Sequence, residues 1–337
     1  MKVAVLMGGR SSEREISLRT GRGIAQALRA LGHGVVAVDA ANGRVLPPGE
    51  EERAALPITA LEPAGETALA RPETLADAEV VLIALHGAAG ENGTLQALLD
   101  LAGKVYTGSG MLASALAMNK AVSKRLFEHD GIPTPRWQLL PADAVAADVD
   151  ASALGGFPLV VKPNEEGSSV GLTVVERAER LPEAMRLAGS LGEILVEEFI
   201  PGRELTVAML GEEALPIVEI RPKSGLYDYE SKYTAGRSEY FCPADLPGTL
   251  AETVRDLGRR AARALGCQGV SRVDFRLDAR DVAQCLEVNT VPGMTPTSLV
   301  PMAARAAGLS YEQVVQRMLD LAVENARQRH TQLHSRT

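Results

Sequence analysis

VVKPNEEGSSVG, residues 160–171, joins two runs of strand-forming residues through a loop of small and acidic residues. Lys162 ends the first run, where burying an ammonium group costs free energy unless an anion meets it. Gly167, Ser168 and Ser169 follow in the loop, and small residues let backbone N–H groups and hydroxyls approach a phosphate. The spacing is not that of a Walker motif. The segment therefore predicts either a phosphate-covering loop of another type or a surface hairpin with a lysine at a strand end.

A second set of polar residues alternates with apolar ones in two later segments. In SRVDF, Arg272 and Asp274 are two residues apart and share a strand face, as do Glu287 and Asn289 in LEVNT. Only residues 278–284 separate these strands, which predicts a hairpin that collects two carboxylates, an amide and a guanidinium on one surface. Paired carboxylates repel unless a cation neutralises them, and hard oxygen ligands suit Mg²⁺. The alternative is the solvated polar face of a strand pair.

Two further glutamates lie near the end of a predicted strand. Glu197 ends the apolar run ILVE, and Glu204 follows seven residues later, beyond Pro201-Gly202. A carboxylate just past a strand end can accept hydrogen bonds from ribose hydroxyls. A solvent-exposed glutamate is the commoner alternative for either residue taken alone.

The first hundred residues predict an α/β region. Residues 3–7 and 35–38 are apolar runs typical of buried parallel strands, and a helical pattern between them makes a βαβ unit. Ser12-x-x-Glu15 predicts a capping box at the start of that helix. The segment lacks the G-x-G-x-x-G fingerprint of dinucleotide binding, and its Ser and Glu residues at a helix start suit a ligand with both an anion and an amine.

Composition excludes several classes of protein. The chain has 337 residues, enough for more than one core, and its 35 basic and 43 acidic residues give a net charge of −8, which argues against nucleic-acid or membrane-surface binding. Three widely spaced cysteines form neither a disulfide framework nor a zinc site. No apolar run reaches the length of a membrane span, and the first apolar run is too short for a secretion signal. We expect a reduced, soluble, cytoplasmic protein.

Aromatic residues cluster in one short segment. The chain has 12 of them, and five lie between residues 227 and 241. Lys232 and Tyr233 sit in this segment among acidic and hydroxyl side chains, so a purely apolar core role is the weaker interpretation. We expect residues 221–241 to form a lid over a site.

Eight segments between residues 6 and 308 carry, in the same order, motifs similar to those of the D-alanine–D-alanine ligases of the ATP-grasp superfamily. They read LMGGRSSEREIS, ALHGAAGENGTLQ, YTGSGMLASALAMNK, VVKPNEEGSSVG, EFIPGRELTVA, YDYESKYTAG, SRVDF and LEVNTVPGMTPTSLVPMAARAAG. The resemblance implies an α/β protein (α+β in its ATP-binding part) with a three-lobed ATP-grasp fold and an N-terminal parallel sheet. We expect an N-terminal substrate domain over 1–108, a central ATP-grasp lobe over 109–200 and a C-terminal lobe over 201–337.

The resemblance also implies roles for individual residues. It assigns ATP binding to Lys120, Lys162, Gly167, Ser168, Ser169, Glu197, Glu198, Phe199, Glu204 and Lys232. It assigns two Mg²⁺ ions, for which Mn²⁺ can substitute, to Asp274, Glu287 and Asn289. It assigns substrate contacts to His86, Lys232, Ser298 and Leu299. It assigns catalysis to Arg272 and the Gly293 N–H, as an oxyanion site, and to a hydrogen-bonded trio of Glu13, Ser168 and Tyr233 that ties the lobes together.

The activity implied by this resemblance is ATP-dependent joining of two D-alanines through a D-alanyl phosphate, with release of ADP and phosphate, for cell-wall precursor synthesis. D-alanine and ATP are then its partners, and a homodimer is expected. The alternatives are a D-alanine–D-lactate ligase, another ATP-grasp carboxylate–amine ligase, and a non-catalytic nucleotide-binding module. The last alternative does not explain why two metal-type carboxylates and Arg272 occur together.

Overall fold

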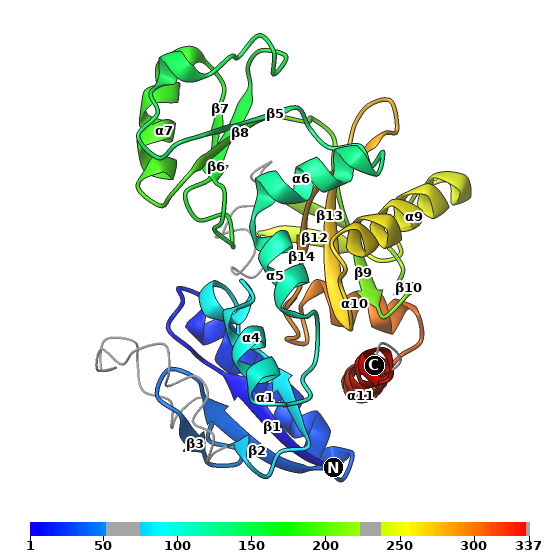
Figure 1. The fold of residues 1–337 in the computed structure, drawn as a ribbon. Helices are drawn as coiled ribbons and strands as arrows, with labels where there is room; N and C mark the ends of the chain where they lie inside the picture. Colours follow the sequence, from blue (N-terminus) through cyan, green and yellow to red (C-terminus); the bar gives the residue numbers. More distant parts are fainter. Residues whose placement is uncertain (52–74, 223–236, 335–337) are drawn as a thin grey trace.

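Three separate β-sheets organise the chain (Figure 1). The computed structural model describes residues 1–51, 75–222 and 237–334. The N-terminal sheet is mainly parallel, whereas the two sheets that follow are antiparallel throughout the described strands. This mixture of parallel and antiparallel sheets confirms the predicted fold class.

The N-terminal sheet has the strand order β3-β2-β1-β4. Its first strand, helix and second strand form the predicted βαβ unit, since β1 pairs in parallel with both β2 and β4. Apolar side chains from both faces of the sheet are buried, as expected for a parallel sheet. The elements of this region are β1 (Lys2–Met7), α1 (Arg14–Ala30), β2 (Gly34–Asp39), β3 (Arg44–Leu46), β4 (Val80–Ile83), η3 (Ala88–Gly90) and α4 (Thr94–Leu101).

The predicted capping box at the start of α1 is wrong. The helix begins at Arg14, and Glu13 occupies the N-cap position without a capping hydrogen bond from its side chain. Ser11 holds the turn instead, because its Oγ accepts a hydrogen bond from the Glu13 N–H at 3.2 Å and donates one to the His86 carbonyl at 2.6 Å. The start of α1 is thus tied to the loop after β4, and the Glu13 carboxylate is left to make contacts elsewhere.

The central sheet has the order β5-β8-β6-β7 and is covered by α7, which packs on β6. Strands β6 and β7 form the predicted antiparallel pair around the 164–169 loop. The elements here are β5 (Trp137–Leu140), η4 (Ala146–Asp148), β6 (Leu159–Pro163), β7 (Thr173–Val175), η5 (Ala178–Arg180), α7 (Leu181–Gly189) and β8 (Ile194–Glu198).

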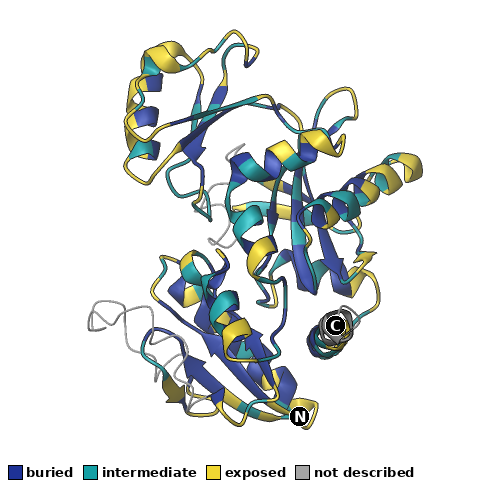
Figure 2. Ribbon diagram, in the orientation of Figure 1, coloured by how far each residue is buried: buried dark blue, intermediate teal, exposed yellow. Residues whose placement is uncertain are grey.

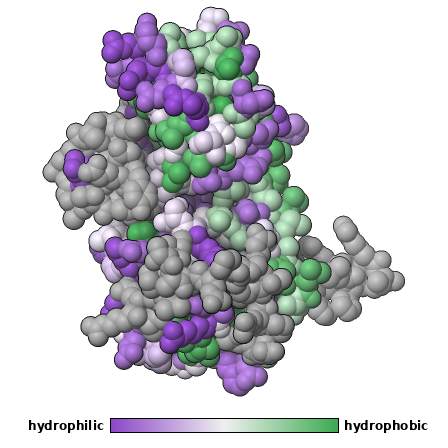
Figure 3. All heavy atoms as spheres, turned by 90° about the vertical axis from the view of Figure 1, so that its left-hand side faces the viewer, coloured by the Kyte–Doolittle hydropathy of each residue, from purple (hydrophilic) through white to green (hydrophobic). Residues whose placement is uncertain are grey.

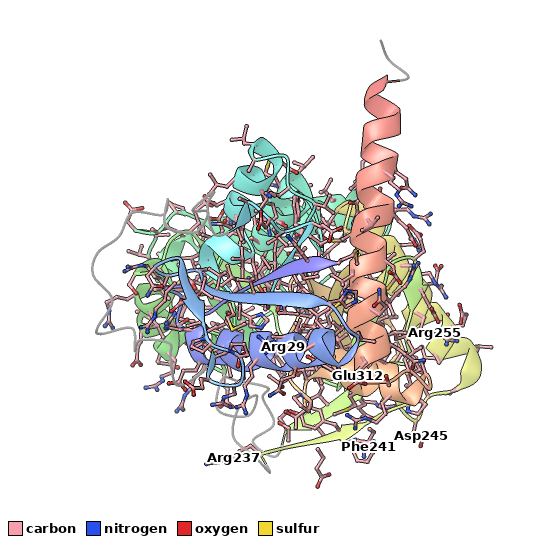
Figure 4. The ribbon with its side chains drawn as sticks, turned by 90° about the horizontal axis from the view of Figure 1, so that it is seen from below. Arg29, Arg237, Phe241, Asp245, Arg255 and Glu312 are labelled. Carbon is pink, nitrogen blue, oxygen red and sulfur yellow. The ribbon has the colours of Figure 1, made fainter. Side chains whose placement is uncertain are left out.

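The C-terminal sheet is the largest, with the path β12-β11-β9-β13-β14 and a short β10 paired to β9. Its elements are β9 (Arg203–Leu210), β10 (Glu213–Ala214), β11 (Val218–Pro222), β12 (Ser238–Phe241), α9 (Gly248–Ala264), β13 (Val270–Leu277), β14 (Ala283–Asn289), α10 (Leu299–Ala306) and α11 (Tyr311–His334). Ser310 and Gln313 form a capping box at the start of α11, through hydrogen bonds of 2.7 and 3.2 Å. Figure 4 shows Phe241, the last residue of β12, and Arg237, which directly precedes this strand, at the outer edge of the molecule.

Two helix groups link the sheets. Helices α5 (Met111–Met118) and α6 (Lys120–His129) precede the central sheet in sequence but pack against β14 of the C-terminal sheet. Helix α11 follows the C-terminal sheet in sequence but packs against α1, beside the N-terminal sheet (Figure 4). One hydrophobic core therefore runs from β1 and α1 into β9, α10 and α11, whereas the central sheet has a core of its own.

Burial follows this arrangement. Figure 2 shows the buried residues concentrated in the three sheets and on the helix faces that cover them. On the face drawn in Figure 3, hydrophilic and hydrophobic described residues are interspersed in small patches. Within the described ranges, no helix combines the length and the apolar character that crossing a membrane requires.

A buried ion pair fixes the N-terminal sheet to its helix. Arg14 and Asp39 are 6% and 1% exposed and lie 2.5 Å apart, and the same guanidinium donates to the Gly9 carbonyl at 2.8 Å. Removing one partner of a buried pair leaves the other charge without compensation, which costs about 3–5 kcal/mol.

We expect Asp39→Asn to lower the free energy of unfolding by about 3–5 kcal/mol because Arg14 stays buried without a counter-charge. Urea unfolding followed by circular dichroism measures the change. Asp77→Asn is the control, since Asp77 and its partner Lys2 are exposed and 3.9 Å apart, and such pairs contribute about 0–1 kcal/mol. Equal effects of the two substitutions would contradict the role given to Asp39.

Candidate active site

Two adjoining cavities lie where the three sheets approach one another. The first is lined by residues of the N-terminal region, the 164–169 loop and the C-terminal sheet, and the second lies between the central and C-terminal sheets. Of the predicted site residues, the first cavity collects Glu13, His86, Lys120, Gly167, Ser168, Arg272, Glu287, Asn289, Gly293, Ser298 and Leu299. The second collects Lys120, Lys162, Gly167, Ser168, Ser169, Glu197, Glu198, Phe199, Glu204, Asp274 and Glu287.

The wall between the cavities is common to both. Lys120, Glu166, Gly167, Ser168 and Glu287 line each of them. Residues of this wall can therefore contact ligands in both cavities, so that a chemical group can be transferred from a ligand in one cavity to a ligand in the other.

The first cavity is closed at one end by a contact between distant parts of the chain. Ser168, on the loop after β6, donates a hydrogen bond to Oε1 of Glu13 before α1. Gly87 packs against the same carboxylate, since a Cβ at this position would lie 2.9 Å from Glu13 Oε2. A carboxylate that is only 9% exposed and faces a cavity is suited to bind an ammonium group.

His86 lies beside this carboxylate and is held at both ring nitrogens. Nδ1 lies 2.9 Å from the Val291 carbonyl and 3.7 Å from Glu91 Oε1, while Nε2 lies 3.1 Å from Thr20 Oγ1. Burial alone would lower the pKa of His86, but the Glu91 and Glu13 carboxylates outweigh it and raise that pKa. A positive charge on the imidazole is thereby favoured, which suits a substrate carboxylate.

The loop between the cavities is fastened to the start of α6. Asn119 caps this helix by accepting from the Val122 N–H at 3.0 Å, and its amide nitrogen donates to Glu165 at 2.6 Å. Lys120 donates to the Glu166 carbonyl at 2.6 Å and lies 3.6 Å from Glu287 Oε2. The ammonium of Lys120 is thus fixed at the shared wall.

The same loop adopts an uncommon backbone conformation. Ser168 and Ser169 have φ angles of 49° and 59°, in the left-handed region that non-glycine residues seldom occupy. Such conformations persist where surrounding contacts hold them and concentrate at ligand-binding segments. This observation favours the phosphate-covering interpretation of the loop over an ordinary hairpin.

A buried group of three charges lies at the second cavity, which two of its members, Lys162 and Glu197, line. Glu197 is 2% exposed, and its two oxygens lie 2.8 Å from Lys124 Nζ and 2.7 Å from Lys162 Nζ. Burial would raise the pKa of Glu197, but the two ammonium groups overcome this effect and lower it. Burial lowers the pKa of Lys124, which also donates to Thr134 Oγ1 at 2.7 Å. The group keeps one net positive charge beside the cavity.

The hairpin predicted from SRVDF and LEVNT is confirmed. Strands β13 and β14 pair so that Arg272 faces Asn289 and Asp274 faces Glu287, with an irregularity in register after Asp274. Arg272 binds Asp274 through contacts of 2.7 to 3.2 Å, and Thr206 donates to the same carboxylate at 2.5 Å. The polar side chains thus form one surface at the junction of the cavities.

The turn after β14 completes the first cavity. Gly293 leaves no space for a side chain, because a Cβ there would lie 2.9 Å from Ser298 Oγ. That hydroxyl accepts from the Thr295 N–H at 3.1 Å and contacts Thr295 Oγ1 at 2.8 Å, just before α10 begins at Leu299. Thr295, Ser298 and Leu299 line this end of the cavity at the N-terminus of α10, and a helix N-terminus with neighbouring hydroxyls suits an anion.

Comparisons with known proteins decide the family. Models named D-ala D-ala ligase N-terminus and C-terminus match residues 2–109 and 126–320. A D-alanine--D-alanine ligase of Gloeobacter violaceus is 44% identical over 96% of this chain and all of its own length. One from Bordetella petrii is 46% identical over 93% of this chain and 89% of its own length. The chain belongs to the D-alanine–D-alanine ligase family.

Solved structures agree with this assignment. The ATP complex of the D-alanine--D-alanine ligase from Bacillus anthracis has a TM-score of 0.80 and 31% identity, and covers 98% of this chain and 99% of its own. The enzyme from Coxiella burnetii has a TM-score of 0.81 at 25% identity, over 99% of this chain and 97% of its own. The three-lobed ATP-grasp architecture predicted from the sequence is that of this ligase family.

The roles given to the predicted site residues stay predictions, and the structure does not describe all of these residues. Lys232, Tyr233 and most of the predicted lid lie outside the described residues. Glu198 lines the second cavity but pairs with Arg136 at 2.9 Å. Glu197 makes its described contacts with two lysines, so its predicted role at adenine stays a prediction.

Sequence reasoning missed residues that support the predicted ones. They are Thr20, Glu91, Lys124, Thr206 and Arg276. Lys124 is four residues after Lys120 and therefore on the same helix face, and Arg276 continues the alternation of Arg272 and Asp274. These two could have been found from spacing alone. The contacts of Thr20, Glu91 and Thr206 depend on segments brought together only by the fold.

We expect Glu197→Gln to lower the free energy of unfolding by about 3–5 kcal/mol without ATP, because Lys124 and Lys162 then lack the carboxylate they share. Since the pKa of Glu197 is lowered, its stabilising effect is complete above the ordinary value of 4.5 and is lost as the pH falls through the lowered value. The difference between wild type and variant in urea unfolding should therefore shrink in acid.

Glu252→Gln is the matched control for this experiment. Glu252 also faces two cations, Arg255 and Arg259, but is 54% exposed on α9. We expect its loss to cost under about 1 kcal/mol. If Glu197→Gln lowers the free energy of unfolding no more than Glu252→Gln does, the buried charge group does not stabilise the fold.

Proposed function

We propose that the chain joins two D-alanines into D-alanyl-D-alanine, with ATP converted to ADP and phosphate. The observation that carries this proposal is the wall shared by the two cavities. It places Lys120 and the 166–168 loop between a cavity suited to a nucleotide and a cavity suited to an amino acid. A carboxylate in one cavity can then meet the terminal phosphate of a nucleotide in the other.

The chemistry proceeds in two steps. A carboxylate is a poor electrophile, so an oxygen of the first D-alanine attacks the γ-phosphorus of ATP, and ADP leaves. The amine of the second D-alanine attacks the carbonyl carbon of this acyl phosphate, loses a proton and expels phosphate. Glu13 holds the ammonium of the first substrate, Lys120 and Lys162 offset phosphate charge, and Arg272 with the Gly293 N–H stabilises the oxyanion.

Mg²⁺ is proposed to bind Asp274, Glu287 and Asn289. The described residues contain no group of three His, Cys, Asp or Glu side chains placed to hold a metal. A set of two carboxylates and one amide oxygen fits Mg²⁺, which usually takes few protein ligands and completes its shell with phosphate oxygens and water. When bound, the ions neutralise charge on the phosphates. Arg272 lies 2.7 Å from Asp274 Oδ2, so this arginine couples the metal set to the oxyanion site.

A hydroxy acid as second substrate is the nearest alternative, and it is not favoured. The curated relatives described above are named for D-alanine as both substrates. Tyr233 within SKY is the sequence feature we connect with the dipeptide product. A purely nucleotide-binding module would not need the amino-acid side of the site with Glu13 and His86.

We also propose a homodimer in the cytoplasm. Leu101, Met111 and Leu112 on the contacting helices α4 and α5 are 87%, 45% and 65% exposed, and grouped exposed apolar residues are typical of interfaces. Burial raises the pKa of Cys242 to about 11 and that of Cys267 to about 12, so these thiols stay protonated at neutral pH. Sedimentation at a single-chain mass of 35.7 kDa would exclude the dimer.

We expect ATP-dependent release of phosphate with D-alanine and none with L-alanine. The site contacts the ammonium and carboxylate from fixed directions, so the enantiomer presents its methyl group in place of hydrogen. A phosphate-release assay with each enantiomer measures this, with Mg²⁺ present and after chelation by EDTA. Equal rates with both enantiomers would refute the substrate assignment.

We expect Arg272→Ala to lower kcat by about 10²–10³-fold, since it removes an oxyanion contact. Arg272→Lys keeps the charge but loses the planar pair of donors, and should fall between the variant and the wild type. Steady-state kinetics at saturating ATP and D-alanine measure both. A near-normal kcat in the alanine variant would place the oxyanion site elsewhere.

A further inference from the structure

One partly buried cation in the second cavity has no part in the chemistry described above. Arg276 lies on β13, two residues beyond Asp274 on the same strand face, and its side chain is 12% exposed. It lines the second cavity together with Phe199, Ile200 and Glu204. Removing a guanidinium from water costs free energy, so we expect its contacts in this cavity to offset that cost.

Arg276 makes contacts with two different segments of the cavity wall. Its Nη1 lies 3.3 Å from Glu204 Oε2, directly across the strand pair, where the register places Arg276 opposite Glu204. Its Nε donates to the Ile200 carbonyl at 3.0 Å, and its guanidinium lies 5.6 Å from the centre of the Phe199 ring. One side chain thus fixes a carboxylate on β9 and the connection between β8 and β9.

These two segments face the part of the cavity suited to a nucleoside. Val160, Leu172, Ile220 and Leu286 line the same cavity and supply apolar walls suited to a flat base. Glu204 is the acceptor placed to bind ribose hydroxyls, and its carboxylate can do so only if it is correctly aimed. The Arg276 guanidinium, 3.3 Å from Glu204 Oε2, limits the rotation of this carboxylate.

We propose that Arg276 is a positioning residue for the nucleoside, acting through the Glu204 carboxylate and the Phe199–Ile200 connection; this inference rests on the proposed function. It sets the affinity for ATP and the preference for a ribose over a deoxyribose. It takes no part in phosphoryl transfer or in binding D-alanine, which occur at the other end of the cavity.

The test is Arg276→Met, which keeps an apolar stem and removes the donors. We expect the KM for ATP to rise about tenfold, since a charge-assisted hydrogen bond and the orientation it gives are lost. The wild type should prefer ATP over 2′-deoxy-ATP, and the variant should prefer it several-fold less. The kcat at saturating ATP and the KM for D-alanine should change less than twofold. Arg276→Lys, with one charged group and no fork, should be intermediate.

Arg263→Met is the matched control. Arg263 pairs with Glu212 at 3.2 Å, but both residues are exposed and lie away from the cavities. We expect it to leave both nucleotide KM values unchanged. Direct binding of ATP to each variant by equilibrium dialysis, with thermal unfolding as a folding check, separates loss of affinity from loss of structure.

Each outcome decides the inference. An unchanged KM and unchanged ribose preference in Arg276→Met would overturn it, as would a fall in kcat and in D-alanine affinity that matches a loss of folded protein. Equal use of ATP and 2′-deoxy-ATP by the wild type would show that Glu204 does not read the ribose. Failure of the proposed function gives a different result, namely no phosphate release from the wild type with D-alanine.

Discussion

The rest of the site depends on one electrostatic constraint, which is that a carboxylate and two ammonium groups are buried together between two sheets. Glu197 and Lys162 belong to the central sheet, whereas Lys124 is on α6, which packs on the C-terminal sheet. None of these charges could be buried alone at an acceptable cost. Together they join the two lobes and leave a positive charge beside the cavity, so one interaction both positions the lobes and prepares a site for phosphates.

Much of the fold could be predicted because local patterns agree with the tertiary structure. The βαβ start and the pair of strands around the loop between β6 and β7 are specified by continuous apolar runs and turn residues, and the hairpin of β13 and β14 by alternation of apolar and polar residues. The prediction of a capping box at the start of α1 was wrong because Ser11 is bound to the carbonyl of His86, 75 positions away, and no local sequence pattern indicates such a contact. The packing of α5 and α6 on the C-terminal sheet likewise could not be predicted from the order of the elements along the chain, because these helices precede the central sheet.

For a similar reason, some residues of the site could be predicted from the sequence and others could not. Residues that recur at strand spacing could be predicted as sets, namely Arg272 with Asp274 and Glu287 with Asn289. Glu91 and Thr20 meet His86 from different elements, so only the folded chain shows that they hold its ring. The family resemblance supplied roles for single residues, and the structure adds what holds those residues in place.

The separation of the hydrophobic cores has a consequence for motion. The N-terminal and C-terminal sheets share one core through α10 and α11, whereas Leu159, Val161 and Ile194 belong to a core that is closed within the central sheet. A rotation of the central sheet therefore exposes little apolar surface and disturbs mainly polar contacts, which water can replace. We therefore expect the central sheet to open as a separate cooperative unit, and its amide hydrogens to exchange with solvent at a lower opening free energy than those of β1 and β9.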